Sequence, residues 1–156
     1  MTYVLQAVIA GDELLRVALR DLPAARVAPL GQGLSLAPMT GKLFAAVADG
    51  TDVDHLGFWR LPGGFDRLLA EWSTAGPLAY VEAEYFGGVG EQHAAVWAGG
   101  AITLGPLHVQ EGQPTPPAGS PISQALRRLG VLTSATEDEF SAAGLGRHRH
   151  SEGWIA

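Results

Sequence analysis

The side chains best suited to chemistry lie between residues 82 and 93. Glu82 and Glu84 are two residues apart in a segment rich in aromatic and branched residues, so they share one face if that segment is a strand. Two carboxylates on one face can share a metal or a proton, because crowding of like charge raises one pKa and makes that group an acid. A histidine opposite them, His93, would add a ligand or a base. If the protein is an enzyme, these three residues are its candidate catalytic set.

The same residues also fit a simpler role. A strand face that carries Glu82 and Glu84 can point to solvent, where a cross-strand Glu–His pair has modest strength. Glu91 and Gln92 extend this polar region into the next strand. We therefore expect a surface for binding another protein at these four residues. Burial of the two carboxylates beside Trp97 would instead require polar partners for them.

Two other segments contain metal-capable side chains. Asp52, Asp54 and His55 are close together, but they have no matched partner at a recognised spacing, and an acidic loop or a helix start explains them. His148 and His150 lie on one side of an extended tail, with no third ligand at a fixed spacing. We expect no metal site and no cofactor.

Familiar catalytic and phosphate-binding motifs are absent from the sequence. No G-x-S-x-G segment occurs, which removes the nucleophile elbow of Ser–His–Asp hydrolases. The glycine-rich run 87–90 precedes a predicted strand, and the only lysine is Lys42, whereas a phosphate loop needs a helix N-terminus and usually a following lysine.

The elements that must position these residues form a predicted antiparallel meander at about 77–105. Strands are expected over 78–86 and 92–98, and the Gly99-Gly100 pair is suited to a two-residue turn into a third strand over 101–104. That turn would place Trp97 opposite Ile102 and Ala95 opposite Leu104.

The register of the first hairpin stays open. A loop of Gly87 to Gly90 puts Glu84 opposite His93, whereas a five-residue loop puts Tyr85 there. At least one glycine of this loop must adopt a positive φ.

Helix signals flank the meander. Capping residues and apolar stripes predict helices that begin near Asp12, Thr40, Phe65, Ser120 and Thr136, the last as a capping box. The apolar segment 3–10 predicts a central strand, and 107–119 a linker or ordered loop. The fold class is therefore α+β, an antiparallel sheet with three to five helices mainly on one face. We expect one domain over 1–156, with a flexible tail from about 147.

Composition restricts the function classes. The chain of 156 residues is 47% hydrophobic, which is enough apolar content to form a folded core. Its net charge is −6, and its basic residues do not form the clustered basic surface that nucleic-acid binding requires. No apolar run is long enough for a membrane span, and the N-terminus lacks the basic region of a signal peptide. The absence of cysteine excludes disulfides and thiolate sites and fits a cytoplasmic location.

Several short patterns in the C-terminal half resemble a group of known proteins. They are Tyr85-Phe86-Gly87-Gly88-x-Gly90-x-Gln92, Ala95-Val96-Trp97, Gly105-Pro106, Pro121-Ile122 and Ala125-Leu126-Arg127-x-Leu129-Gly130-Val131. Together they resemble small, uncharacterised bacterial proteins that include toxin-immunity-like proteins. The resemblance rests on structural residues and implies a non-enzymatic binding role.

Two functions follow as hypotheses. The favoured one is a small, non-enzymatic cytoplasmic protein that binds another protein through its acidic face. The alternative is a small enzyme or ligand-binding protein with Glu82, Glu84 and His93 in a pocket. The two differ in geometry, because a pocket requires these side chains to converge in a concave site.

Overall fold

The fold is built on one six-stranded antiparallel sheet. The computed structural model describes residues 2–53 and 56–155. The strands follow the order β2-β3-β1-β4-β5-β6, and each pair is antiparallel. Their bounds are β1 (Thr2–Gly11), β2 (Ala28–Pro29), β3 (Leu34–Pro38), β4 (Leu78–Phe86), β5 (Val89–Ala98) and β6 (Ala101–Val109). The first predicted strand is central, as expected, because β1 pairs with both β3 and β4.

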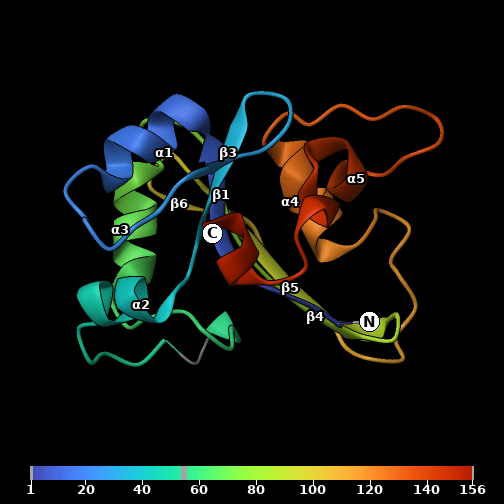
Figure 1. The fold of residues 1–156 in the computed structure, drawn as a ribbon, viewed down its shortest axis with the longest axis horizontal. Helices are drawn as coiled ribbons and strands as arrows, with labels where there is room; N and C mark the ends of the chain where they lie inside the picture. The colour runs from blue at the N-terminus through green and yellow to red at the C-terminus, as the bar shows by residue number, and fades with distance from the viewer. Residues whose placement is uncertain (1, 54–55, 156) are drawn as a thin grey trace.

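Helices lie on both faces of this sheet (Figure 1). One face carries α1 (Asp12–Leu19), α2 (Gly41–Val47) and α3 (Phe65–Trp72). The other carries α4 (Pro121–Arg128), α5 (Glu139–Ala143) and the 3-10 helices η2 (Leu145–Arg147) and η3 (Ser151–Trp154). The α+β class and the antiparallel sheet are confirmed, but the helices do not gather mainly on one face.

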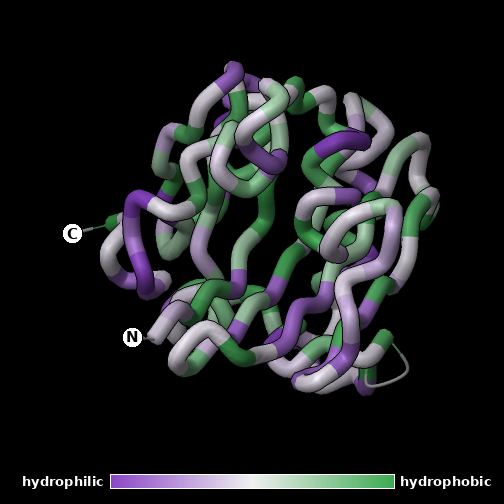
Figure 2. The backbone as a smooth tube through the Cα atoms, turned by 90° about the vertical axis from the view of Figure 1, so that its right-hand side faces the viewer, coloured by the Kyte–Doolittle hydropathy of each residue, from purple (hydrophilic) through white to green (hydrophobic). Residues whose placement is uncertain are grey.

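Both faces are covered because the central strands are apolar on both sides. In β4, Val81 and Ala83 pack toward α4, whereas Leu78 and Tyr80 pack toward α3. Each face must therefore be buried by its own layer of helices. Figure 2 shows the result as hydrophobic strands in the interior, with hydrophilic stretches on the outer loops. No helix of the described ranges has the length and apolar character needed to cross a membrane.

The first hairpin of the meander has a shorter turn than either expected loop. Gly87 and Gly88 form the turn with φ of 61° and 84°, so Phe86 pairs with Val89. Glu82 consequently lies opposite His93, and Glu84 lies opposite Glu91. The faces are those of the four-residue loop, but the cross-strand partner of each residue is displaced by two positions, so that Glu84 lies opposite Glu91 and not His93.

The second hairpin agrees with expectation at its turn and departs from it further along. Gly99 and Gly100 form the turn, and Trp97 pairs with Ile102. A shift in register between Val96 and Trp97 then places Val96 opposite Leu104, so the expected pairing of Ala95 with Leu104 is wrong. Beyond this irregularity β6 continues to Val109, through a segment for which the sequence predicts a linker or loop.

Two predicted caps are present, and one helix begins later than expected. Thr40 and Ser120 accept hydrogen bonds from the N–H groups three residues onward and cap α2 and α4. The predicted capping box at Thr136 is wrong, because Asp138 caps α5 through the N–H of Ser141. Asp competes well for this position because its carboxylate accepts strongly and suits the positive helix end.

The C-terminal tail, which the sequence predicts to be flexible from about 147, packs against β1. The N–H of Val4 donates to the carbonyl of Arg149 at 2.7 Å, and the N–H of Gln6 donates to Ser151 Oγ at 3.4 Å. Trp154 is buried in the same core as α4. One aromatic anchor and a short stretch of backbone pairing are enough to order a polar tail.

Candidate functional site

Glu82 holds a loop onto the sheet. Its side chain is fully buried; Oε1 accepts from the N–H of Trp59 at 2.7 Å, and Oε2 accepts from the N–H of Arg60 at 2.6 Å. Tyr80 on the same strand face donates its hydroxyl to the carbonyl of Arg60 at 2.5 Å. Burial raises the pKa of Glu82 to about 7, and the two N–H donors and Arg60 oppose that rise. Both carboxylate oxygens are thus occupied by backbone.

His93 lies beside Glu82 among aromatic rings. It is only 4% exposed, its ring stacks on His108 with centroids 3.8 Å apart, and the Trp59 ring meets it edge-on at 4.5 Å. Burial, together with the neighbouring His108, lowers the pKa of His93 to about 4, although Glu91 acts in the opposite direction. The imidazole is therefore neutral at neutral pH.

Glu84 and Glu91 lie in an open groove at the end of the same sheet face. We call it the Trp59–Phe86 groove; its volume is about 220 Å³, and it is lined by Trp59, Glu84, Phe86, Val89, Gly90, Glu91 and Glu111. Phe86 is 75% exposed and Trp59 43% exposed, so apolar surface faces solvent next to three carboxylates. Glu91 contacts His108 Nε2 at 3.2 Å, whereas Glu84 and Glu111 form no ion pair with any residue of 2–53 or 56–155.

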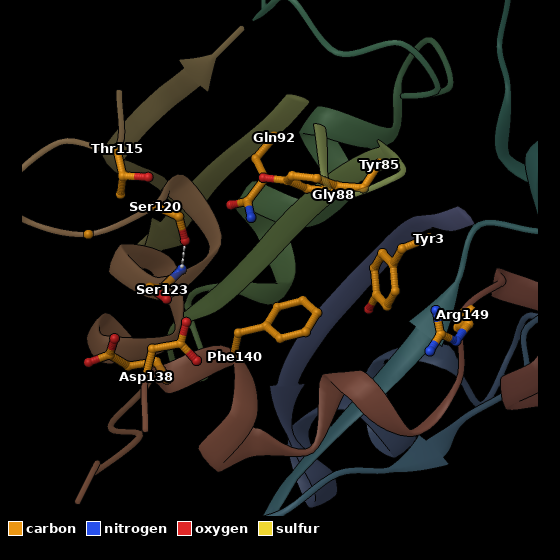
Figure 3. Close-up of a pocket in the computed structure, with 12 residues that line it drawn as sticks. Tyr3, Tyr85, Gly88, Gln92, Thr115, Ser120, Ser123, Asp138, Phe140 and Arg149 are labelled. Carbon is orange, nitrogen blue, oxygen red and sulfur yellow. Dashed lines mark hydrogen bonds between the residues drawn. The ribbon is translucent and has the colours of Figure 1, made fainter. Parts of the chain in front are cut away.

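A larger cavity lies on the opposite face, between the sheet and the α4–α5 pair (Figure 3). This α4–α5 cavity has a volume of about 690 Å³. The rings of Tyr3 and Phe140 meet edge-on at 5.4 Å in its wall. The other lining residues are Tyr85, Gly88, Gln92, Thr115, Gly119, Ser120, Ser123, Asp138, Glu139 and Arg149.

Most polar groups in the α4–α5 cavity already have structural partners. Gln92 accepts from the N–H of Ile122 at 3.0 Å, and Glu139 accepts from Arg127 at 3.3 Å. Ser120 and Asp138 cap helices. Gln92 is therefore separated from the acidic face on which we expected it, because neighbouring strand residues point to opposite sides.

The candidate catalytic residues are adjacent in the sheet without sharing a pocket. Glu82 and His93 are buried and line neither the Trp59–Phe86 groove nor the α4–α5 cavity, while Glu84 is exposed in the groove. The catalytic role of these three residues stays a prediction.

The metal-capable residues predicted from the sequence belong to the loop around Asp52 and to the C-terminal tail. Asp52 is exposed in a loop, and Asp54 and His55 lie outside the described residues. In the tail, the rings of His148 and Trp154 meet edge-on with centroids 4.7 Å apart, and the backbone of His150 forms an isolated β-bridge with Val4 of β1. A different group comes together: Glu91, His93 and His108 offer ligand atoms that all lie within 4.8 Å of one another.

Sequence reasoning missed His108, Phe86 and Glu111 as site residues. His108 belongs to the part of β6 that reads as a loop, and only the extended pairing of β5 with β6 places it opposite His93. Exposed aromatic residues carry no sequence signal that separates them from core residues. Only a prediction that the second hairpin continues past Pro106 would have identified His108 as a neighbour of His93.

Comparisons of the chain with protein-family models, curated proteins and solved structures find no match.

Proposed function

We propose that this chain is a non-enzymatic protein-binding protein that holds a basic side chain or segment of its partner in the Trp59–Phe86 groove. One observation carries the proposal. Six large hydrophobic side chains are exposed among the described residues, and three of them, Trp59, Phe86 and Val89, line this one groove. The same groove contains Glu84, Glu91 and Glu111.

The aromatic surface supports a protein interface. Scattered single hydrophobic residues are ordinary on a protein surface, whereas apolar side chains gathered beside polar ones mark interaction sites. Aromatic residues are enriched in interfaces because they bury a large area with little loss of conformational freedom. Phe86 and Val89 flank a tight turn, which holds both side chains in place without burying them.

The charge of the groove selects the partner. Glu84 and Glu111 have no cationic partner in the described part of the chain, and the net charge of the protein is −6. A Lys or Arg side chain would meet carboxylates on one side and the Trp59 ring on the other, which combines ion pairing with a cation–π contact. Complementary charge also raises the association rate at low salt.

The groove suits a protein partner better than a metabolite. Its volume of about 220 Å³ is below the roughly 300–1,000 Å³ of typical small-molecule sites. Both carboxylate oxygens of Glu82 accept from backbone N–H groups, so Glu82 supports the loop that carries Trp59 and is not free to act as a catalytic acid or base. This use of Glu82 favours binding over catalysis.

The proposal agrees with the resemblance to toxin-immunity-like proteins, which implies a non-enzymatic binding role. We also propose a cytoplasmic location, supported by the absence of cysteine from the chain.

A peptide probe tests the proposal. A fluorescent Gly/Ser peptide with four interspersed arginines is titrated with the protein in EDTA and low salt, next to the same peptide with glutamine at those positions. We expect saturable binding of the arginine peptide alone, weakened at least about fivefold by Phe86→Ala and by added salt. The matched control is Leu132→Ala, an exposed hydrophobic residue outside the groove. Equal binding of both peptides, or no effect of Phe86→Ala, would refute the proposal.

The α4–α5 cavity supports a second candidate function, the binding of an apolar anion. Its volume of about 690 Å³ is within the usual range for small-molecule sites. Three aromatic residues line it, and the side chains of Arg149 and Tyr85 hydrogen-bond to no other described residue. An aromatic wall with one free guanidinium fits a ligand with an apolar body and one anionic group.

The dye 8-anilinonaphthalene-1-sulfonate has this chemistry and is the probe for the second candidate. Native protein should bind about one equivalent, and Arg149→Gln should weaken binding while Arg20→Gln does not. Absence of saturable binding, or equal binding by both variants, would exclude this candidate.

A further inference from the structure

Three side chains with metal-binding chemistry meet on the face of β5 and β6. Glu91 and His93 are two residues apart on β5, so both point to the same side of the sheet. His108 on β6 is the direct cross-strand partner of His93. One ligand atom from each residue lies within 4.8 Å of the other two. The sheet thus positions two imidazoles and one carboxylate without help from a mobile loop.

His93 supplies a second, independent observation. Its side chain is only 4% exposed, and its Nε2 has no hydrogen-bond partner among the described residues. A buried polar atom without a partner destabilises a protein by roughly 1–3 kcal/mol, so native proteins keep few of them. No described protein group satisfies this nitrogen, and a ligand that accepts its lone pair would.

We propose that Glu91, His93 and His108 bind a divalent transition-metal ion, with zinc as the best-fitting ion. Neutral imidazole and carboxylate are common zinc ligands, and three protein ligands leave a fourth position open for water or another group. Magnesium and calcium take oxygen ligands and fit a two-histidine set poorly. The proposal is independent of the peptide-binding function, although both involve Glu91.

Metal binding must change the arrangement of the two rings. The imidazole planes of His93 and His108 are 15° from parallel at a centroid distance of 3.8 Å. The lone pair of each ring lies in its own plane, so one ion cannot lie in both planes while the rings stay stacked. Three ligand atoms on one tetrahedral zinc are roughly 3.4 Å apart, given bond lengths near 2.1 Å.

The residue that can move is His108. Its side chain is 35% exposed and that of Glu91 is 34% exposed, whereas His93 is fixed between Trp59 and the strands. A turn of the His108 ring would separate the stack, replace its contact with Glu91 and direct both groups at one ion. Glu91 belongs both to this site and to the Trp59–Phe86 groove.

Calorimetric titration with zinc chloride tests the site on the full chain, after removal of metal with a chelator. We expect one equivalent bound per chain, with at least about tenfold weaker binding in His108→Ala and in Glu91→Gln. Both side chains are partly exposed, so these variants spare the core, and a thermal melt verifies their folding. The control is the double variant His148→Ala/His150→Ala, which removes the tail histidines and should bind zinc as the parent does.

Histidine ring signals in NMR spectra provide the second readout. One equivalent of zinc should shift the signals of two rings in the parent chain, as the stack of His93 and His108 separates, and the same addition should shift the His93 signal much less in His108→Ala. Absence of one-to-one binding, unchanged affinity in His108→Ala, or loss of binding in the tail variant would overturn the proposal. Peptide binding is measured in EDTA, so failure of one experiment leaves the other intact.

Discussion

Glu82 and His93 face each other across β4 and β5, and burial shifts their pKa values in opposite directions. Desolvation disfavours the charged form of each group, so it raises the pKa of an acid and lowers the pKa of a base. The sequence places Glu82 and His93 on one face only if the first loop has four residues, and it left that register open. It could not predict their burial, since the covering segment is the loop that carries Trp59 and Arg60.

The two shifts predict opposite pH dependences of stability. The pKa of Glu82 rises from 4.5 to about 7 on folding, so its contribution is complete below pH 4.5 and is lost as the pH rises through 7. The pKa of His93 falls from 6.5 to about 4, so its contribution is complete above pH 6.5 and is lost as the pH falls through 4. Between about pH 4.5 and pH 6.5 the two contributions to stability change with pH in opposite directions and offset each other.

Single variants should reveal each effect. Between about pH 5 and pH 6, the free energy of unfolding should rise with pH in Glu82→Gln and fall with pH in His93→Gln, each by about 1 kcal/mol per pH unit. The parent should change much less. Urea unfolding at several pH values in EDTA measures all three. Parallel pH curves for the two variants would show that the burial of these groups is misassigned.

At the scale of the element, the first hairpin depends on its glycines for two different reasons. Gly87 and Gly88 have the positive φ values that the sequence predicts for this loop. Gly90 does not, but a Cβ there would lie 1.9 Å from the carbonyl oxygen of Glu84. The strands approach closely at this point, and only a residue without a side chain fits. The sequence shows that the loop is rich in glycine, but the reason why glycine is required at each position depends on the register of the two strands.

Gly90→Ala should therefore destabilise the protein by about 2 kcal/mol or more, because backbone must shift to admit the methyl group. Gly11→Ala is the control, since a Cβ at Gly11 meets nothing within 4 Å. Thermal melts of both variants test the hairpin. A Gly90→Ala protein that melts at the parent temperature would contradict the pairing of β4 with β5.

At the scale of the whole molecule, features that depend on local sequence were predicted better than features that depend on contacts between distant segments. Turn glycines, helix caps such as Ser120 and the central position of β1 depend on neighbouring residues, and they are confirmed. The two-sided covering of the sheet, the ordered tail and the continuation of β6 depend on contacts between distant segments. The Trp59–Phe86 groove could not be predicted from the sequence for the same reason, because Trp59 precedes the meander in the chain and Glu111 follows it.

The packed tail supports a stability prediction. Trp154 is buried against β1 and the α4 layer, so Trp154→Ala should lower the free energy of unfolding by about 3 kcal/mol. The neighbouring Ile155 is partly exposed, and Ile155→Ala should change it by no more than about 0.5 kcal/mol. Urea denaturation of both variants compares them. Equal stability of the two variants would contradict the packing of Trp154 and favour the flexible tail predicted from the sequence.

The central claim is that the Trp59–Phe86 groove is the surface that meets a basic partner. Site-specific photocrosslinking tests it most directly, with p-benzoylphenylalanine placed at Phe86 or, as the control, at Leu132, in extracts of the source organism. The groove should yield a covalent adduct with a protein of basic isoelectric point, suppressed by high salt and by Glu84→Lys, and the control position should not. Adducts that form equally at both positions, or that persist undiminished in Glu84→Lys, would contradict the claim.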